Sequence, residues 1–393
     1  MAHPSRSAGR FTFWRRRLLA LVVPAALAVG IWVALGDGTS AGDGATSTAT
    51  DNAGDASASA DPPSKLSSAE LAGERVIAGF PGRRPPAKVK RMIGDGELAG
   101  VILFSENLGS RHHARHLIHR LQAIQRPTGL RDPLLVMIDQ EGGLVKRLSG
   151  PPSASAQQMG RRGRAYSRRQ GARTARNLKS VGVNVNLAPV LDVGRPGSAI
   201  RAQHRSFGGT PRRVIRTAIP FATAMQQHGV AATGKHFPGL GAAPEDTDFA
   251  VQRIRLRRSR LRRIDEKPYG PFASRDGDLV MLSTAIYPHL SHKPAAFAKP
   301  IATGELRRHV GFRGVSISDA LETVSARNFG GPAKVGVAAA RAGTDLALFT
   351  DFHAAATAGQ AIKRALRSGR LDRARFEQSA QRVLDLRAAL AHR

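Results

Sequence analysis

The chain of 393 residues contains no cysteine, few aromatic residues and few acids. Without cysteine it has no disulfide, no thiolate nucleophile and no cysteine-based metal site. Aromatic residues make up 5% of the chain, which leaves few platforms on which nucleic-acid bases stack. Asp and Glu total 29 against 60 Lys and Arg, giving a formal net charge of +31. Because such a charge attracts polyanions, we expect the protein to reside beside an anionic cell envelope, with no nucleic-acid partner.

The N-terminal part predicts export from the cytoplasm. Residues 1–17 form a basic segment that ends in Trp14-Arg15-Arg16-Arg17, and residues 18–35 are uncharged and mostly apolar. That run nearly spans a hydrocarbon core of about 30 Å, and the preceding arginines favour a cytoplasmic N-terminus. Two interpretations stay open, a transmembrane anchor and a signal peptide cleaved near Ala26-Leu27-Ala28. We favour the anchor, because Ile31-Trp32-Val33-Ala34-Leu35 continues the apolar run past that point.

Residues 36–65 are predicted to be a disordered linker. They consist largely of Gly, Ala, Ser, Thr and Asp, with almost no large apolar side chain. Such a segment buries too little apolar surface to offset the entropy lost on folding. We therefore expect a flexible tether between the membrane segment and a catalytic domain outside the cytoplasm.

Residues 66–393 are predicted to form one α/β domain, a (β/α)₈ barrel of the TIM type. Short apolar runs alternate with longer amphipathic segments. The runs include 100–104, 134–138, 183–187, 230–233, 279–282, 315–317 and 346–349. The helical segments include 111–126, 161–181, 211–228, 335–342 and a closing helix at 371–393. Nearly continuous apolar strands indicate a parallel sheet covered on both faces. A doubly wound sheet is less favoured, because no dinucleotide-binding glycine fingerprint or P-loop is present.

Polar residues follow several of these strands, at the end where barrel active sites lie. They are Asp139, Arg147, Arg205, Lys235, His236 and Asp319. Together they offer hydrogen-bonding groups and cations for a polyhydroxylated ligand, and a carboxylate able to attack an electrophilic carbon. After Lys235 and His236 comes a loop with Gly239 and Gly241, whose conformational freedom lets the chain move or approach a ligand closely. Taken alone, Asp319 is also a candidate helix cap.

The motifs resemble glycoside hydrolase family 3, in its single-domain bacterial β-N-acetylglucosaminidase (β-N-acetylhexosaminidase) branch. The matching stretches appear in the family order: Gly100–Phe104; Ile138-Asp139-Gln140-Glu141-Gly142-Gly143 with Arg147; Asn186–Asp192; Arg205-Ser206-Phe207-Gly208; Lys235-His236-Phe237-Pro238-Gly239 with Gly241; and Gly311–Leu321. The resemblance implies that Asp319 is the nucleophile of a retaining hydrolase. It further implies that Asp139, Arg147, Arg205, Lys235 and His236 bind the sugar at the non-reducing end.

The resemblance fails at the general acid/base. In the branch, the loop after Lys-His-Phe-Pro-Gly ends in Asp-Ser/Thr-His, and the histidine transfers the proton. Here the corresponding residues are Asp246-Thr247-Asp248, so the dyad aspartate is kept and Asp248 occupies the histidine position. Leu240 and Ser283-Thr284 likewise stand where histidines are common. Most other retaining glycosidases use a carboxyl group as the acid, and a nearby Asp246 would raise the pKa of Asp248 toward that role.

We therefore expect an envelope-anchored hydrolase that releases β-linked N-acetylglucosamine-type residues from cell-wall glycans, acting in peptidoglycan turnover. Two alternatives stay open: a catalytically weakened homologue that binds wall sugars, and a family 3 enzyme of different specificity, such as a β-glucosidase. We expect a monomer with a carbohydrate substrate. No cofactor or metal is expected, because neither a cage of oxygen ligands nor a histidine cluster with ligand spacing is recognised, and the predicted chemistry needs none.

Overall fold

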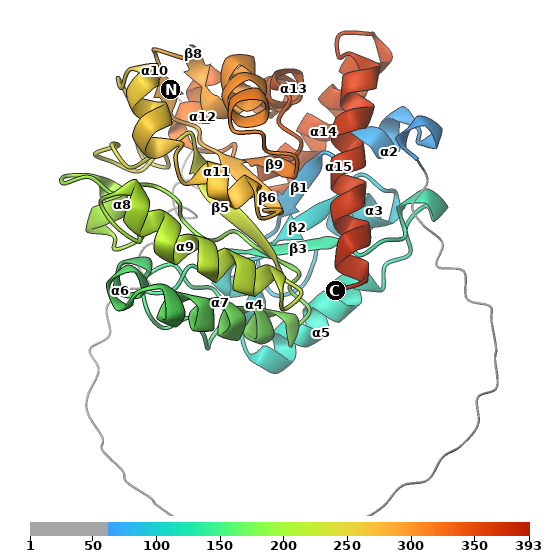
Figure 1. The fold of residues 1–393 in the computed structure, drawn as a ribbon. Helices are drawn as coiled ribbons and strands as arrows, with labels where there is room; N and C mark the ends of the chain where they lie inside the picture. The colour runs from blue at the N-terminus through green and yellow to red at the C-terminus, as the bar shows by residue number, and fades with distance from the viewer. Residues whose placement is uncertain (1–61) are drawn as a thin grey trace, which may run out of the picture. The chain divides into compact units, whose positions relative to one another are not determined.

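A computed structural model describes residues 62–393, and these form a closed parallel barrel surrounded by helices (Figure 1). The strand order in the eight-stranded sheet is β10-β1-β2-β3-β4-β5-β6-β9. A parallel bridge between Ile317 and Leu346 joins the two edge strands and closes the sheet. The prediction of a (β/α)₈ barrel is confirmed. The predicted segments 1–17 and 18–35, and the linker up to residue 61, lie outside the described residues.

The barrel strands are short, and every residue in them is buried. They are β1 Val76–Gly79, β2 Gly100–Ile102, β3 Leu135–Ile138, β4 Val185–Asn186, β5 Ala231–Phe237, β6 Leu279–Leu282, β9 Val315–Ser318 and β10 Ala347–Phe349. A separate antiparallel pair consists of β7 Ile286–Tyr287 and β8 Ser291–Pro294. β1, β7 and β8 were not predicted from the sequence. The fifth strand was expected to end at Thr233, whereas β5 continues through Phe237 and carries Lys235 and His236 within it.

Helices connect the strands and cover the outside of the barrel. The α-helices are α2 Ser68–Gly73, α3 Ala87–Gly94, α4 Ser105–Leu108, α5 Arg111–Gln122, α6 Ala156–Arg162, α7 Arg164–Lys179, α8 Ala199–Ala202, α9 Pro211–Gln226, α10 Arg258–Arg260, α11 Tyr269–Ala273, α12 Val324–Phe329, α13 Pro332–Ala342, α14 Phe352–Arg367 and α15 Arg373–Ala391. Shorter turns are η1 Pro63–Lys65, η2 Thr128–Leu130 and η4 Ala295–Phe297, and two π-helices are η3 Leu261–Asp265 and η5 Pro300–His309.

Sequence signals fix several helix ends. The hydroxyl of Ser67 caps α2 in a reciprocal capping box with Glu70, and Thr210 caps α9, whose first residue is Pro211. The N-caps of α14 and α15 are Asp351 and Asp372. Each cap satisfies backbone N–H groups that a helix start otherwise leaves without partners.

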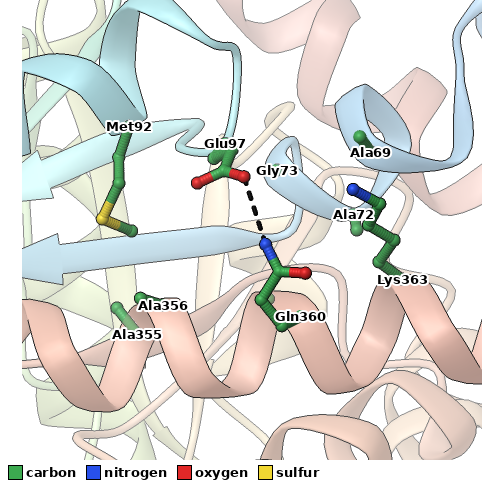
Figure 2. A pocket seen from close by; sticks show the side chains of 10 residues that line it. Ala69, Ala72, Gly73, Met92, Glu97, Ala355, Ala356, Gln360 and Lys363 are labelled. Atoms are coloured by element: carbon green, nitrogen blue, oxygen red, sulfur yellow. Dashed lines mark hydrogen bonds between the residues drawn. The ribbon is translucent and has the colours of Figure 1, made fainter.

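The outer layer of the core is closely packed where α2, α3 and α14 meet (Figure 2). The cavity lined by these elements is about 10 Å³, which leaves room for one water at most. Gln360 of α14 donates across it to a carboxylate oxygen of Glu97, 3.2 Å away. The contact between these three helices is therefore a packing interface.

The final helix closes the amino-terminal end of the barrel. Val383, Leu386 and Leu390 of α15 belong to the same apolar cluster as the inward side chains of the strands. Beside them, the fully buried Arg387 pairs with Glu74 and donates to the backbone carbonyls of Leu130, Asp132 and Pro133. The predicted closing helix thus holds together segments that are far apart in the sequence.

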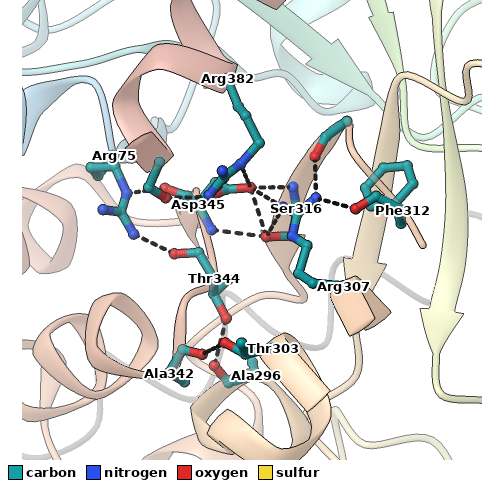
Figure 3. A network of polar contacts seen from close by, with 12 residues as sticks. Arg75, Ala296, Thr303, Arg307, Phe312, Ser316, Ala342, Thr344, Asp345 and Arg382 are labelled. Carbon is teal, nitrogen blue, oxygen red and sulfur yellow. Dashed lines mark hydrogen bonds and ion pairs between the residues drawn. The ribbon is translucent and has the colours of Figure 1, made fainter. Parts of the chain in front are cut away.

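A second buried network ties the last strands to that helix (Figure 3). Its centre is Asp345, which is fully buried just before β10. The carboxylate accepts hydrogen bonds from the backbone N–H and hydroxyl of Ser316, at 2.7 and 2.9 Å, and pairs with Arg307 and Arg382. Burial by itself would raise the pKa of Asp345, but the arginines outweigh it and hold the pKa well below its usual range.

Candidate active site

The floor of the candidate site is an ion-pair network at the carboxyl ends of β3 and β5. Lys235 lies 2.7 Å from Asp139 and 2.8 Å from Glu141, and its side chain is 2% exposed. Arg205 donates two hydrogen bonds of 2.9 Å to the two oxygens of Glu141. Arg147 lies 3.8 Å from the other oxygen of Asp139. All four predicted residues of this floor are therefore brought together.

The charges in this floor are set by their partners. Burial works to raise the pKa of Asp139, but Lys235 and Arg147 together lower it below its ordinary value. Burial also opposes ionisation of Glu141, yet Arg205 and Lys235 hold its pKa far below the usual range. The pKa of Lys235 is raised by the two carboxylates in spite of its burial. Asp139, Glu141 and Lys235 are therefore all charged near neutral pH, which suits recognition of sugar hydroxyls.

The imidazole of His236 is oriented by a buried carboxylate. Its Nδ1 lies 2.8 Å from one oxygen of Asp192, and because a carboxylate only accepts, Nδ1 carries the proton. The other oxygen of Asp192 accepts from the backbone N–H groups of His236 and Leu240, at 3.2 and 2.7 Å. The remaining nitrogen, Nε2, is then available as an acceptor in the neutral ring. Asp192 thus positions the histidine and the start of the following loop.

The predicted nucleophile lies at the end of β9. Its backbone N–H donates to Leu282, and its side chain accepts a 2.8 Å hydrogen bond from the backbone N–H of Ala320. Burial raises the pKa of Asp319, and the nearby His236 and Lys235 act against that rise. Asp319 is not the cap of the next helix, because Thr323 caps α12. The helix-cap interpretation is therefore wrong, and the carboxylate lies close enough to Lys235 and His236 for them to influence its pKa.

The loop after β5 is closely held at its base. Tyr287 donates to the carbonyl of Gly239 at 3.0 Å, and the backbone of Gly241 accepts from Arg195 at 3.0 Å. A Cβ on Gly241 would lie 2.0 Å from the carbonyl oxygen of Val193, so only glycine fits. The glycines therefore allow the loop to pack against the backbone after β4.

The acidic end of the loop reaches back to the floor. Asp246 lies 3.6 Å from Arg205 and accepts a 3.1 Å hydrogen bond from the backbone N–H of Asp248. Asp246 is also among the charges that raise the pKa of Asp319, the predicted nucleophile. Leu240, at a position where the branch has a second histidine, is buried in the core and offers no proton-transfer group.

Two further site residues, Glu141 and Asp192, were not predicted. Both lie in the motifs that follow strands, so the sequence contained the signal. Glu141 is two residues beyond Asp139, and alternation along an extended chain places both on one face. Asp192 follows β4 by six residues, and only the fold brings it against His236.

Comparisons with known proteins agree with this geometry. The glycosyl hydrolase family 3 N-terminal domain matches residues 66–386. The chain belongs to glycoside hydrolase family 3. An uncharacterized secreted glycosyl hydrolase of Arthroderma benhamiae is 37% identical over 332 residues, covering 81% of this chain and 93% of the relative. A β-hexosaminidase of Alkalilimnicola ehrlichii is 32% identical, covering 70% of this chain and 79% of the relative.

Solved structures give the same result. A family 3 β-N-acetylglucosaminidase from a Paenibacillus species superposes with a TM-score of 0.78 at 32% identity, covering 83% of this family 3 chain. The chain spans 63% of the length of that protein. The family and the branch indicated by the motifs are thereby confirmed, and so is the enzyme class, a glycoside hydrolase.

Proposed function

We propose that this family 3 protein is a retaining glycosidase that releases β-linked N-acetylglucosamine-type residues. The observation that carries the proposal is the convergence of Asp319 with Lys235 and His236 at the carboxyl ends of the barrel strands. A nucleophilic carboxylate beside an ionised sugar-binding floor is what the first step of a retaining mechanism requires. The N-acetyl specificity is supported by the β-hexosaminidase and β-N-acetylglucosaminidase relatives.

In the proposed mechanism, the floor binds the terminal sugar before reaction. Asp139, Arg147 and Lys235 contribute acceptors and donors for its hydroxyls, and Arg205 keeps Glu141 ionised. The Asp319 carboxylate attacks the anomeric carbon, and the bond to the leaving oxygen breaks as that oxygen takes a proton. Water then cleaves the glycosyl-enzyme bond after giving its proton to the same acid/base group.

We assign the acid/base role to Asp248, with Asp246 as its partner. The support is positional. Asp246 accepts a hydrogen bond from the backbone N–H of Asp248, and its other oxygen lies 3.6 Å from Arg205 of the floor. The influence of Asp246 on the pKa of Asp319 supports a location of this end of the loop near that carboxylate. A carboxyl group is the usual proton donor of retaining glycosidases.

A second candidate function is sugar binding with little turnover. The observation that favours it is the aspartate at the histidine position, since loss of a general acid/base costs about 10²–10⁴ in rate. A family 3 glycosidase of different sugar specificity is the third candidate. For the substrate source we propose peptidoglycan-derived glycans, and for the location the cell envelope, because the secreted relative and the basic composition agree with export.

The location rests on a segment that the structure does not describe. Within residues 62–393 no helix is both long and apolar enough to cross a membrane. The anchor or signal peptide at 18–35 therefore stays a proposal, as does the monomeric state.

The activity test uses 4-nitrophenyl N-acetyl-β-glucosaminide, with the glucoside and xyloside as specificity controls. We expect release of 4-nitrophenol from the N-acetyl substrate by the wild type and at least about 10³-fold less from Asp319→Ala. Wild-type rates no higher than those of Asp319→Ala over a range of about pH 4–8 would favour the sugar-binding candidate. Preference for the glucoside would favour the third candidate.

A further inference from the structure

A buried carboxylate outside the candidate active site has no partner. Glu266 follows the π-helix η3, on the connection between β5 and β6, and is 2% exposed. Within the part of the chain that is described, neither of its side-chain oxygens has a hydrogen-bond partner. Burial and the nearby Glu305 raise the pKa of Glu266 to about 8. An unpartnered carboxyl group in this position costs stability unless a cation or proton satisfies it.

Two potential metal ligands lie beside Glu266. Glu305 and His309 are four residues apart in η5, on the connection that leads to β9, so they lie on one side of that helix. One ligand atom from each of the three residues lies within 4.8 Å of the others. Glu305 is 2% exposed, whereas His309 is exposed and gives solvent access to the group. The three ligands therefore form a partly open cluster that bridges two helical segments.

The ligand set is typical of zinc. Imidazole together with carboxylates suits zinc and its neighbours among the first-row metals better than calcium or magnesium, which prefer oxygen alone. Three protein ligands with a water in the fourth position complete a tetrahedral zinc site, at about 2.0–2.2 Å from each ligand. Ligand atoms at these distances from one tetrahedral ion lie about 3.4 Å apart, so the group, whose atoms lie within 4.8 Å of one another, has to contract when zinc binds.

The two arginines near Glu305 do not fill the site. Arg262 contacts Glu305 at 2.8 Å and Arg258 at 3.3 Å, but their side chains are 38% and 51% exposed. Solvent screens charges that are this exposed. Oε1 of Glu305 faces both arginines, Arg262 at 3.1 Å and Arg258 at 3.3 Å, whereas Oε2 accepts one hydrogen bond from Arg262, at 2.8 Å, and keeps a second lone pair for a metal. Both oxygens of Glu266 lack a hydrogen-bond partner within residues 62–393, so this carboxyl group is open to a cation.

We propose that Glu266, Glu305 and His309 form a structural zinc site that joins the β5–β6 connection to the β8–β9 connection. The sequence predicted no metal because the carboxylate at 266 is distant from the other two ligands along the chain. Within residues 62–393 the three residues form no hydrogen bond or ion pair with Asp319 or with the floor of the candidate active site, so this inference does not depend on the proposed glycosidase activity.

The test measures zinc bound per chain by equilibrium dialysis after treatment with a chelator, together with the melting temperature. Exposed histidines at 112, 116 and 119 on α5 have helical spacing and are a second source of zinc binding. All proteins in the test therefore carry His116→Gln. We expect Glu266→Gln to bind one zinc ion fewer per chain and to lose the rise in melting temperature that zinc gives the parent.

His309→Ala is the second variant, since this exposed side chain can be removed without opening the core. We expect it to weaken zinc binding at least about tenfold. His289→Ala, at another exposed histidine, is the matched control and should bind zinc as the parent does. The inference is overturned if Glu266→Gln and His309→Ala both bind as much zinc as the parent. It is also overturned if zinc leaves the parent's melting temperature unchanged, in which case Glu266 is a buried protonated acid.

Discussion

At the residue scale, the proposed chemistry depends on Asp248, which stands at the histidine position of the branch. If Asp248 is the acid/base, Asp248→Asn should lower kcat on a disaccharide by about 10²–10⁴. The loss should be smaller on 4-nitrophenyl substrates, whose leaving group needs little protonation. Steady-state kinetics on both substrates measure this difference.

The control for that prediction lies on the same loop. Glu245 is exposed, so Glu245→Gln removes a neighbouring negative charge without altering the Asp246–Asp248 turn. Its rates should remain within about twofold of the wild type. If Asp248→Asn behaves like Glu245→Gln on the disaccharide, the acid/base assignment is wrong.

Arg205 links the sugar floor to the acidic loop, with two bonds to Glu141 and one contact to Asp246. Lysine keeps the charge but loses the paired geometry. Because a hydrogen bond to a charged group contributes about 1.5–3 kcal/mol, Arg205→Lys should lower kcat/KM by roughly 10–100-fold. An unchanged kcat/KM would show that Arg205 does not organise the site.

Two site residues, Glu141 and Asp192, were not predicted, because sequence motifs do not specify which side chains come into contact in the folded protein. Asp139, Arg147, Arg205, Lys235 and His236 were predicted because they follow strands in a recognisable order. Glu141 and Asp192 occur in the same motifs, but their role depends on which side chains they contact after folding. Spacing gives the order of strand ends and cannot give the pairing between them.

At the scale of elements, the buried network around Asp345 joins β9, the start of β10 and the helix α15 (Figure 3). Its removal therefore tests how much this junction stabilises the barrel. Asp345→Asn leaves the largely buried Arg307 and the partly exposed Arg382 without their carboxylate partner. Removing one member of a buried charged network costs about 3–5 kcal/mol of unfolding free energy. Urea unfolding measures this loss of free energy. The control is Asp385→Asn, at an exposed position of α15, the helix that carries Arg382, and its unfolding free energy should change little.

The same network predicts a dependence on pH. The pKa of Asp345 is depressed in the folded protein, so its contribution is complete above the unfolded value of about 3.9. The contribution is lost as pH falls from there through the folded pKa. Acid should therefore destabilise the wild type more steeply than Asp345→Asn below about pH 4. If unfolding free energy depends on pH in the same way for the two proteins, Asp345 is not the source of this pH dependence.

The elements themselves were largely predictable. Continuous apolar runs such as 134–138 and 279–282 correspond to β3 and β6, because parallel strands covered on both faces are apolar throughout. β1 was missed since Val76–Gly79 is short and no recognised polar motif follows it. The extension of β5 to Phe237 was also missed, because Lys235 is charged yet fully paired within the barrel.

At the scale of the whole molecule, the net charge of +31 predicts attachment to anionic wall polymers. Residues 62–393 should sediment with peptidoglycan-rich walls at low salt and be released as salt rises, since the Debye length falls from about 30 Å at 0.01 M to about 10 Å at 0.1 M. Asp319→Asn should bind equally, because attachment is electrostatic. If binding to the walls does not weaken as salt rises, the attachment is not electrostatic.

The central claim is that Asp319 forms a covalent bond to the sugar. A 5-fluoro N-acetylglucosaminyl fluoride slows both steps by destabilising an oxocarbenium-like transition state, and its good leaving group lets the first step proceed without an acid. After incubation, peptide mass spectrometry should find one glycosyl adduct, on Asp319, and none in Asp319→Ala. No adduct under conditions where the substrate is hydrolysed, or an adduct on another carboxylate, would contradict the assignment.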